Sequence, residues 1–150
     1  GIEDWQCLGY ADQQFDAFPL SELIRGVYQA MSFAPDWIIT HADTDLKKDH
    51  VVVSEIAKVL GRPRKNPVRI LGAEIPCGSI WNGNPFPAQF YVDITQTIDT
   101  KLHAFEQYQN EIREFPDPFS TKGLRTRAEF RGMESGYAAA EAFQVIRWTY

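Results

Sequence analysis

A short apolar run that leads into a polar loop and then a helical pattern is the feature that most constrains this fold. Trp37–Thr40 is continuous and apolar, as is typical of a strand buried on both faces of a parallel sheet. Residues 41–48 are polar. Apolar positions then recur at helical spacing, at Val53, Ile56, Ala57 and Leu60. A strand followed closely by a helix favours a βαβ unit and therefore a layered α/β fold.

The same alternation continues along the rest of the chain. Apolar runs predict further strands at 68–75, 89–93 and 142–148. Helical periodicity predicts helices at 20–31 and 94–112, and an arginine-rich polar helix follows a proline-bounded break at 116–118. We therefore expect a Rossmann-like, mostly parallel sheet flanked by helices, in one domain that covers residues 1–150.

Capping and breaking residues set the expected ends of these elements. Ser21 is a suitable N-cap for the first helix, while Asp49 and Gly61 mark the first turn and the end of the second. Residues 8–12 predict the end of a strand that runs into a loop. The segment 76–88 is rich in glycine and proline and predicts a long loop, of the kind that often lines a site.

Composition excludes several classes of protein. Apolar residues make up 44% of the 150 residues, so the chain is long and apolar enough to bury a core. No apolar run approaches the roughly 20 residues that span a bilayer, so we expect no membrane segment. The net charge of −5 argues against general binding to nucleic acid or anionic membranes. Cys7 and Cys77 lie far apart, which favours free thiols and a cytoplasmic location.

Candidate chemistry concentrates in Thr40–His50, where two histidines and three aspartates occupy eleven residues. His50 is the strongest candidate, because a neutral imidazole at a helix start can bind zinc while a nearby carboxylate orients it. A solvated or capping histidine is the alternative. Asp45 and Asp43 either bind metal or form Asx turns within the loop. His41 is expected to be packed and hydrogen-bonded, rather than a supporting residue of a metal site.

Two other features have an ordinary explanation. His103 is expected at the surface of the helix at 94–112. A locally basic strip, which is either a solvated face or a contact for a phosphate group, comprises Lys47, Lys48, Lys58, Arg62, Arg64, Lys65 and Arg69.

Several short motifs, taken in order, resemble the LmbE-like (PIG-L) deacetylase family. These enzymes are zinc-dependent hydrolases that remove acyl groups, usually acetyl, from amino sugars and their conjugates. The motifs run from Leu8 to Arg147: LGYAD at 8–12, PDWIITH at 35–41, DLKKDH at 45–50, VDI at 92–94 followed by Lys101, Ala104 and Tyr108, and RG at 131–132 with Gly136 and AEAF at 140–143.

The resemblance also implies a set of site residues. His50 corresponds to one zinc ligand; Asp49 and Lys47 are expected to be catalytic, with Lys47 standing where relatives have a neutral donor. Asp45, Asp12 and Trp81 are expected to contact the substrate. The chain has no His-Pro dipeptide, so the family's His-Pro-Asp-Asp-Glu motif, with its general base and two other ligands, has no counterpart here. The first βα units of the family fold are likewise expected to be absent.

These observations predict part of a zinc-dependent hydrolase that removes an N-acyl group from an amino-sugar-like small molecule. The remaining ligands would come from an amino-terminal segment or a partner chain, and these 150 residues alone are expected to be inactive. One alternative is a non-catalytic descendant that binds a sugar or nucleotide-like ligand, which Lys47 and Asp117 motivate, since Asp117 stands where relatives often have histidine. Another is an unrelated α/β binding domain. Assembly into a homo-oligomer is left open.

Overall fold

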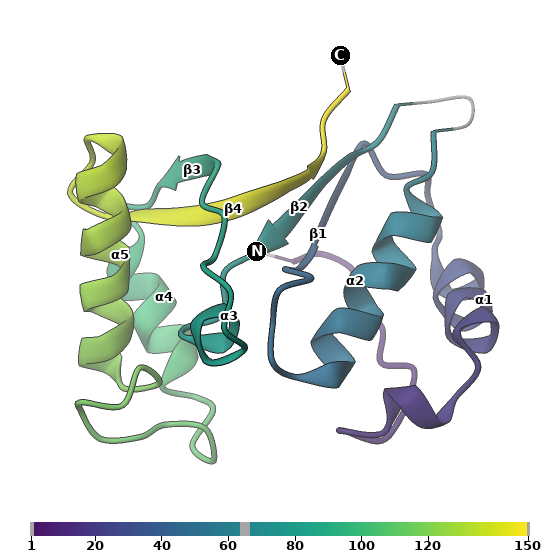
Figure 1. Cartoon of the computed structure of the whole chain (residues 1–150), viewed down its shortest axis with the longest axis horizontal. Coiled ribbons are helices and arrows are strands. Elements are labelled where there is room, and N and C mark those ends of the chain that lie inside the picture. The colour runs from purple at the N-terminus through teal and green to yellow at the C-terminus, as the bar shows by residue number, and fades with distance from the viewer. Residues whose placement is uncertain (1, 64–66, 150) are drawn as a thin grey trace. The chain divides into compact units, whose positions relative to one another are not determined.

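Four strands form one mixed sheet, in the order β1-β2-β4-β3 (Figure 1). The structure is a computed structural model that describes residues 2–63 and 67–149. β1 (Trp37–His41) pairs in parallel with β2 (Arg69–Ala73), with His41 opposite Ala73. β3 (Phe90–Asp93) pairs antiparallel with β4 (Ala140–Arg147). The expected α/β fold with helices flanking a sheet is confirmed.

The antiparallel β3–β4 pair departs from the expected parallel arrangement. Two consecutive helices, α4 (Ile98–Phe105) and α5 (Thr121–Ser135), separate these strands. A pair of helices returns the chain to the end of the strand that it left, and there the Ile94 N–H donates to the Ala139 carbonyl at 3.0 Å. A parallel crossover needs a connection that returns the chain to the opposite end.

The chain divides into two compact units, each described by itself below. The first spans Gly1–Ala73 and Val145–Tyr150, and the second spans Glu74–Gln144. Besides β1 and β2, the first unit contains η1 (Phe15–Ala17), α1 (Leu20–Ala30) and α2 (Lys48–Leu60). The second contains α3 (Gly78–Trp81), β3, α4 and α5. β4 begins in the second unit and ends in the first. The single domain over residues 1–150 stays a prediction.

In the first unit, α2 connects the two parallel strands and covers one face of them. Two apolar clusters fill this layer; their buried members are Leu23, Val52 and Ile56 in one, and Ala57, Val68 and Ile70 in the other. The other face of β1 is open: Trp37 is 42% and Ile39 64% exposed. Burial of this strand on both faces was therefore a wrong prediction, because β1 is an edge strand covered on one side only.

Element boundaries differ from the predicted ones at three places. α1 starts at Leu20 with Pro19 as its N-cap residue, so Ser21 lies inside the helix and does not cap it. Residues 8–12 form no strand. α4 ends at Phe105, well before the predicted 112, because Phe105 is the last residue of this helix to pack on the core of the second unit.

The second unit is built on a core beneath α4 and α5. Its buried members are Ile94, Ile98, Leu102, Leu124, Ala128 and Ala139. Ser120 caps α5 by accepting the Gly123 N–H at 3.0 Å, and Gly136 ends the helix with φ +80°. Arg131 is buried, and its guanidinium donates two hydrogen bonds to the Glu74 carboxylate, from Nε at 2.8 Å and from Nη2 at 2.6 Å.

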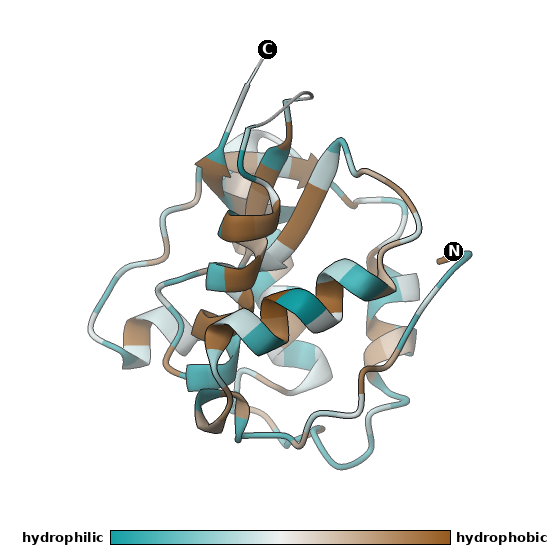
Figure 2. Ribbon diagram, turned by 90° about the vertical axis from the view of Figure 1, so that its right-hand side faces the viewer, coloured by the Kyte–Doolittle hydropathy of each residue, from teal (hydrophilic) through white to brown (hydrophobic). Residues whose placement is uncertain are grey.

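The hydropathy of the helix residues agrees with the packing of the helices on the core. The helices nearest the viewer in Figure 2 alternate between hydrophobic and hydrophilic residues along their length, as expected for helices with one buried side. Among the described residues, no helix combines the length and apolar composition needed to cross a bilayer.

Candidate functional site

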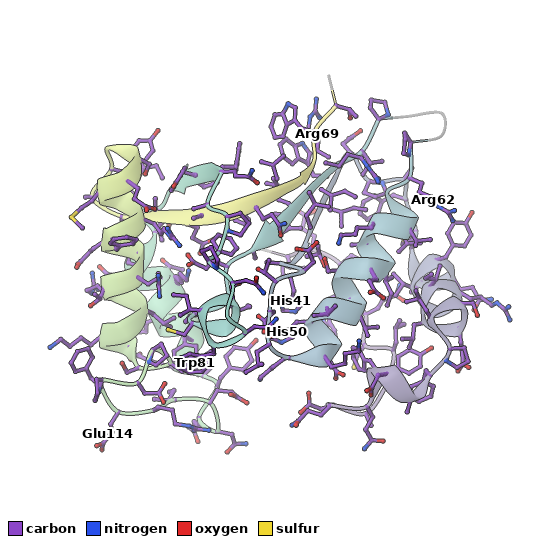
Figure 3. All side chains as sticks on the ribbon, viewed as in Figure 1. His41, His50, Arg62, Arg69, Trp81 and Glu114 are labelled. Carbon is purple, nitrogen blue, oxygen red and sulfur yellow. The ribbon has the colours of Figure 1, made fainter. Side chains whose placement is uncertain are left out.

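Two histidines stack against each other where β1 ends and α2 begins. Their ring centroids are 3.9 Å apart and their planes differ by 6° (Figure 3). His41 is the last residue of β1 and His50 lies in the first turn of α2. The intervening loop begins with the Ala42 N–H donating to the Ala73 carbonyl at 3.3 Å, which extends the β1–β2 pairing by one residue. The loop then turns back, and this brings the helix start over the strand end.

Asp45 lies in the loop between the two histidines and contacts the His50 ring. Its side chain is 3% exposed, and its Oδ2 lies 3.1 Å from His50 Nδ1. Its Oδ1 accepts the Lys47 N–H at 2.9 Å, so the predicted Asx turn is confirmed. Burial acts to raise the pKa of the Asp45 carboxyl, but the close His50 imidazole, the Lys47 N–H and the nearby His41 ring outweigh it and lower the pKa below its ordinary value. Asp45 is thus an anion that orients His50; its predicted substrate contact stays a prediction.

His41 is the member of the pair that sequence reasoning undervalued. Burial lowers its pKa below the ordinary value, and the neighbouring His50 lowers that pKa further, so the ring is neutral at pH 7. The expected packing is confirmed, by the stack on His50. The expected hydrogen bond is not present at Nδ1, which is buried without a partner among the described residues. The signal for His41 was its place at the very end of a strand, one loop away from His50.

Asp49 anchors the N-terminal segment to the start of α2. Its Oδ2 accepts the Gln13 N–H at 2.7 Å and its Oδ1 accepts the Phe15 N–H at 3.1 Å. Asp12 is exposed beside this contact and accepts a hydrogen bond from the Gln13 side chain at 3.2 Å. The structure therefore brings Asp12 and Asp49 into one neighbourhood. It gives Asp49 a structural role, whereas its catalytic role stays a prediction.

Lys47 and Trp81 complete the set of predicted site residues. Lys47 is exposed at the N-cap of α2, and its charge contributes to the lowered pKa of His41. Trp81 belongs to α3 in the second unit and is 57% exposed. The segment 76–88 is not wholly loop, because residues 78–81 form this short helix.

The predicted basic strip has local partners. Lys58 pairs with Asp43 at 2.6 Å, and Arg62 Nε donates to the Val59 carbonyl at 3.0 Å. The Arg69 guanidinium lies over the rings of Trp37 and Trp148, at 5.1 and 5.6 Å. Arg64 and Lys65 lie outside the described residues. These contacts are typical of a solvated surface, and they do not direct the cations toward one point.

The cluster of His41, Asp45 and His50 offers one chemically useful group, the imidazole of His50 held in a fixed orientation. A carboxylate on Nδ1 fixes the ring and directs the other ring nitrogen, Nε2, toward a metal or a proton acceptor. Within residues 2–63 and 67–149, however, no three side chains from His, Cys, Asp and Glu converge as a metal site requires. The zinc ligand at His50 therefore stays a prediction.

Comparison with known proteins shows a shared fold but identifies no family. No protein-family model matches the chain, and no curated protein matches it. Among solved structures, the chain is similar to the crystal structure of the conserved protein TT1542 from Thermus thermophilus. The two share 19% identity with a TM-score of 0.68, over 95% of this chain and 66% of the other. The α/β architecture is shared. The chain spans slightly less than two thirds of that relative.

Proposed function

We propose that this chain contributes one ligand and its supporting residues to a zinc-dependent hydrolase that removes an N-acyl group from an amino sugar or its conjugate. The observation that carries the proposal is the contact of 3.1 Å between His50 Nδ1 and a carboxylate that is 3% exposed. Zinc-binding histidines usually have a carboxylate, a backbone carbonyl or a water on the nitrogen that does not bind the metal.

The neighbours of His50 suit such a site. His41 stays neutral beside it, so it adds no positive charge that would oppose a cation. Lys47 stands one helical turn from His50, where an ammonium group can stabilise an oxyanion. Asp49 holds the adjacent N-terminal segment through the Gln13 N–H, and Asp12 is bonded to the Gln13 side chain. Each of these side chains therefore has a role in binding the substrate, orienting a neighbouring group or stabilising charge.

When bound, zinc supplies a Lewis acid for the acyl carbonyl and activates water. Among the described residues we assign it one ligand, His50, and in this proposal a further segment or a partner chain supplies the remaining ligands and the general base. For this reason we assign no step of hydrolysis to this chain alone. We expect residues 1–150 alone to be inactive, with the His50 ring already oriented as one ligand.

The second candidate is a non-catalytic domain that binds a phosphate-bearing sugar or a nucleotide-like ligand. One observation favours it: an exposed lysine lies close enough to His41 to lower its pKa, and a cation beside imidazoles suits an anion. Asp117 gives it no support, because its Oδ1 accepts the Phe119 N–H at 2.8 Å ahead of α5, as a turn residue does.

The test is a zinc titration followed by the histidine nitrogen resonances. The proposal predicts weak binding in which the ring nitrogens of His50 shift while those of His103, an exposed histidine in the second unit, do not. His50→Ala abolishes the response, and His103→Ala is the matched control that keeps it.

Two outcomes would contradict the proposal. Zinc binding that is unchanged by His50→Ala would remove His50 as a ligand. Tight 1:1 binding together with hydrolysis of N-acetylglucosamine by residues 1–150 would show that the site is complete, and would overturn the claim that ligands come from elsewhere.

A further inference from the structure

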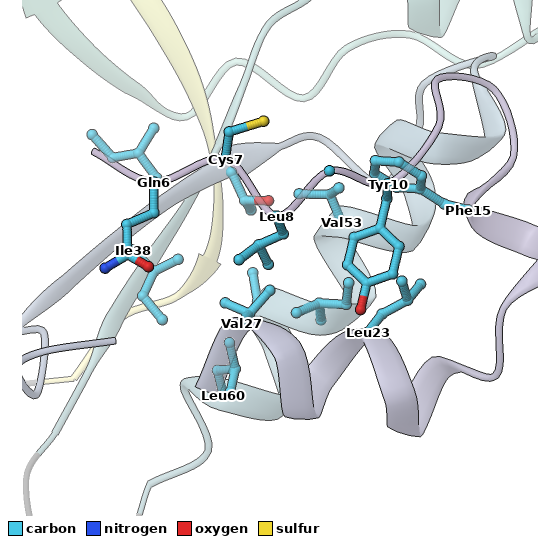
Figure 4. A pocket seen from close by; sticks show the side chains of 15 residues that line it. Gln6, Cys7, Leu8, Tyr10, Phe15, Leu23, Val27, Ile38, Val53 and Leu60 are labelled. Carbon is cyan, nitrogen blue, oxygen red and sulfur yellow. The ribbon is translucent and has the colours of Figure 1, made fainter. Parts of the chain in front are cut away.

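An apolar pocket and an exposed helix face differ in how much they specify about a partner. The pocket, of about 400 Å³ in the first unit, is lined mainly by aliphatic side chains, among them Leu8, Val27 and Leu60 (Figure 4). None of its described lining residues is charged, so the lining selects no one partner. The exposed side of α5 in the second unit carries charges of both signs in a fixed order, and this order restricts what can pack on it.

Helical spacing divides α5 into a buried and an exposed side. The buried side consists of Leu124, Ala128, Arg131 and Gly132. The exposed side follows steps of three or four residues along the helix, at Lys122, Thr126, Glu129 and Met133. Phe130 adjoins this row and is 43% exposed, and Met133 is 75% exposed. The row therefore combines large apolar side chains with charged ones, as the surfaces between protein chains do.

Two charged side chains of α5 are left over when the ion pairs within the unit are assigned. The assigned pairs are Arg125 with Asp99, Arg127 and Arg131 with Glu74, and Glu134 with Arg131. Lys122 and Glu129 form no ion pair with any described residue. The Lys122 ammonium lies 4.2 Å from the centroid of the Phe115 ring, which is 53% exposed. One cation therefore lies about two helical turns from one anion on the same exposed side.

This order of charges is complementary to itself in one orientation. When two copies of α5 cross antiparallel about a twofold axis near Thr126, Lys122 lies opposite Glu129 of the partner subunit, and Glu129 lies opposite the partner's Lys122. Two parallel copies would place like charges opposite each other. The antiparallel register also brings Met133 toward the partner's Phe115, where a thioether can contact the edge of an aromatic ring.

We propose that this side of α5 binds a second copy of the chain, helix against antiparallel helix. The complementary charges select a second copy over a partner of uniform charge, which would meet one attractive and one repulsive group. A single pair of helices buries less than the roughly 1,200–2,000 Å² of a standard interface, so the dimer is weak and in exchange with the monomer. The inference concerns the second unit and is independent of the proposed hydrolase function.

Sedimentation equilibrium of the whole chain, at several protein concentrations, tests the proposal. We expect a concentration-dependent dimer. Lys122→Glu and Glu129→Lys should each weaken dimerisation by about tenfold, because the twofold axis repeats every repulsive pair. A mixture of the two variants should associate as strongly as the wild type, since every opposed pair is again of opposite sign. Lys48→Glu, at an exposed position in the first unit, makes the same change in net charge and is the matched control.

The mixture separates a specific pairing from a folding defect, because two misfolded variants would not restore each other. Met133→Glu provides a second check that does not depend on the ion pairs, and it should also weaken the dimer. A chain that stays monomeric at every concentration would overturn the inference. So would a dimer that neither charge reversal weakens, a mixture that associates no better than its components, or an equal loss on Lys48→Glu.

Discussion

Replacing Asp45 by asparagine tests whether a buried anion holds the histidine pair. The carboxylate is 3% exposed, accepts the Lys47 N–H at 2.9 Å and lies 3.1 Å from His50 Nδ1. Asparagine keeps the shape and one acceptor oxygen, but it loses the charge and presents an NH₂ group to one of these two donors. Hydrogen bonds to a charged group contribute about 1.5–3 kcal/mol each, and neutral ones about 0.5–1.5 kcal/mol.

The expected cost of Asp45→Asn is therefore about 2.5–4.5 kcal/mol in the free energy of unfolding, since one contact of the charged group is lost and the other becomes neutral. Urea unfolding at pH 7 measures it. Asp43→Asn is the matched control in the same loop. Asp43 pairs with Lys58 at 2.6 Å, but the two side chains are 32% and 34% exposed, and such pairs contribute about 0–1 kcal/mol.

The dependence on pH gives a second check. The pKa of Asp45 is lower in the folded protein than its ordinary value of 3.8. Its contribution is therefore fully present above that ordinary value and is lost as the pH falls through the folded pKa. The difference between the wild type and Asp45→Asn is expected to be present above that ordinary value and to shrink in more acidic solution. An equal cost for both variants at pH 7, or a difference that persists unchanged in strong acid, would refute the orienting role of Asp45.

Three further predictions concern other parts of the chain. Because the pKa of His41 is lowered on folding, the unfolded chain binds more protons, and stability should fall as pH falls below 6.5; His41→Phe should flatten that fall in urea titrations at pH 5–7. Arg131→Met should cost about 3 kcal/mol in urea unfolding by leaving the largely buried Glu74 carboxylate with only its longer ion pair to Arg127 at 3.6 Å, and adding Glu74→Leu should recover much of the loss. Gly132→Ala places a Cβ 2.5 Å from a backbone carbonyl and should cost about 1–3 kcal/mol by the same assay, whereas Met133→Ala, at a position 75% exposed, should cost little.

Local patterns were sufficient for the β1–α2–β2 part of the fold. The apolar run before residue 41 and the helical spacing after it depend only on neighbours in the sequence, and β1 and α2 follow them closely. Gly61 ends α2 as expected, with its N–H donating to the Ala57 carbonyl at 2.9 Å. The direction of β4 beside β3 and the open face of β1 cannot be obtained in this way, because they depend on how the chain returns through α4 and α5 and on what packs against the sheet.

The sequence indicated some residues of the candidate cluster but not their contacts. His50 and Asp45 stood out because two histidines and three aspartates occupy eleven residues between a predicted strand and helix. The stack of His41 on His50 depends on how the loop turns back, which no local spacing specifies. The same is true of Asp49, which bonds to a segment more than thirty residues earlier in the chain.

The charge of Lys47 distinguishes the two proposed functions. Lys47 is exposed, and its ammonium is close enough to His41 to lower the pKa of that ring. A zinc ion at His50 is repelled by this charge, so Lys47→Met should tighten zinc binding, by about fivefold for a dipositive ion in a largely aqueous setting. An anionic sugar phosphate is attracted by it, so the same variant should weaken binding of glucosamine 6-phosphate. Lys48→Met, one residue along at another exposed position, is the control for net charge. Stronger zinc binding with unchanged phosphate binding supports the hydrolase half-site, and the reverse pattern would replace it with the anion-binding domain.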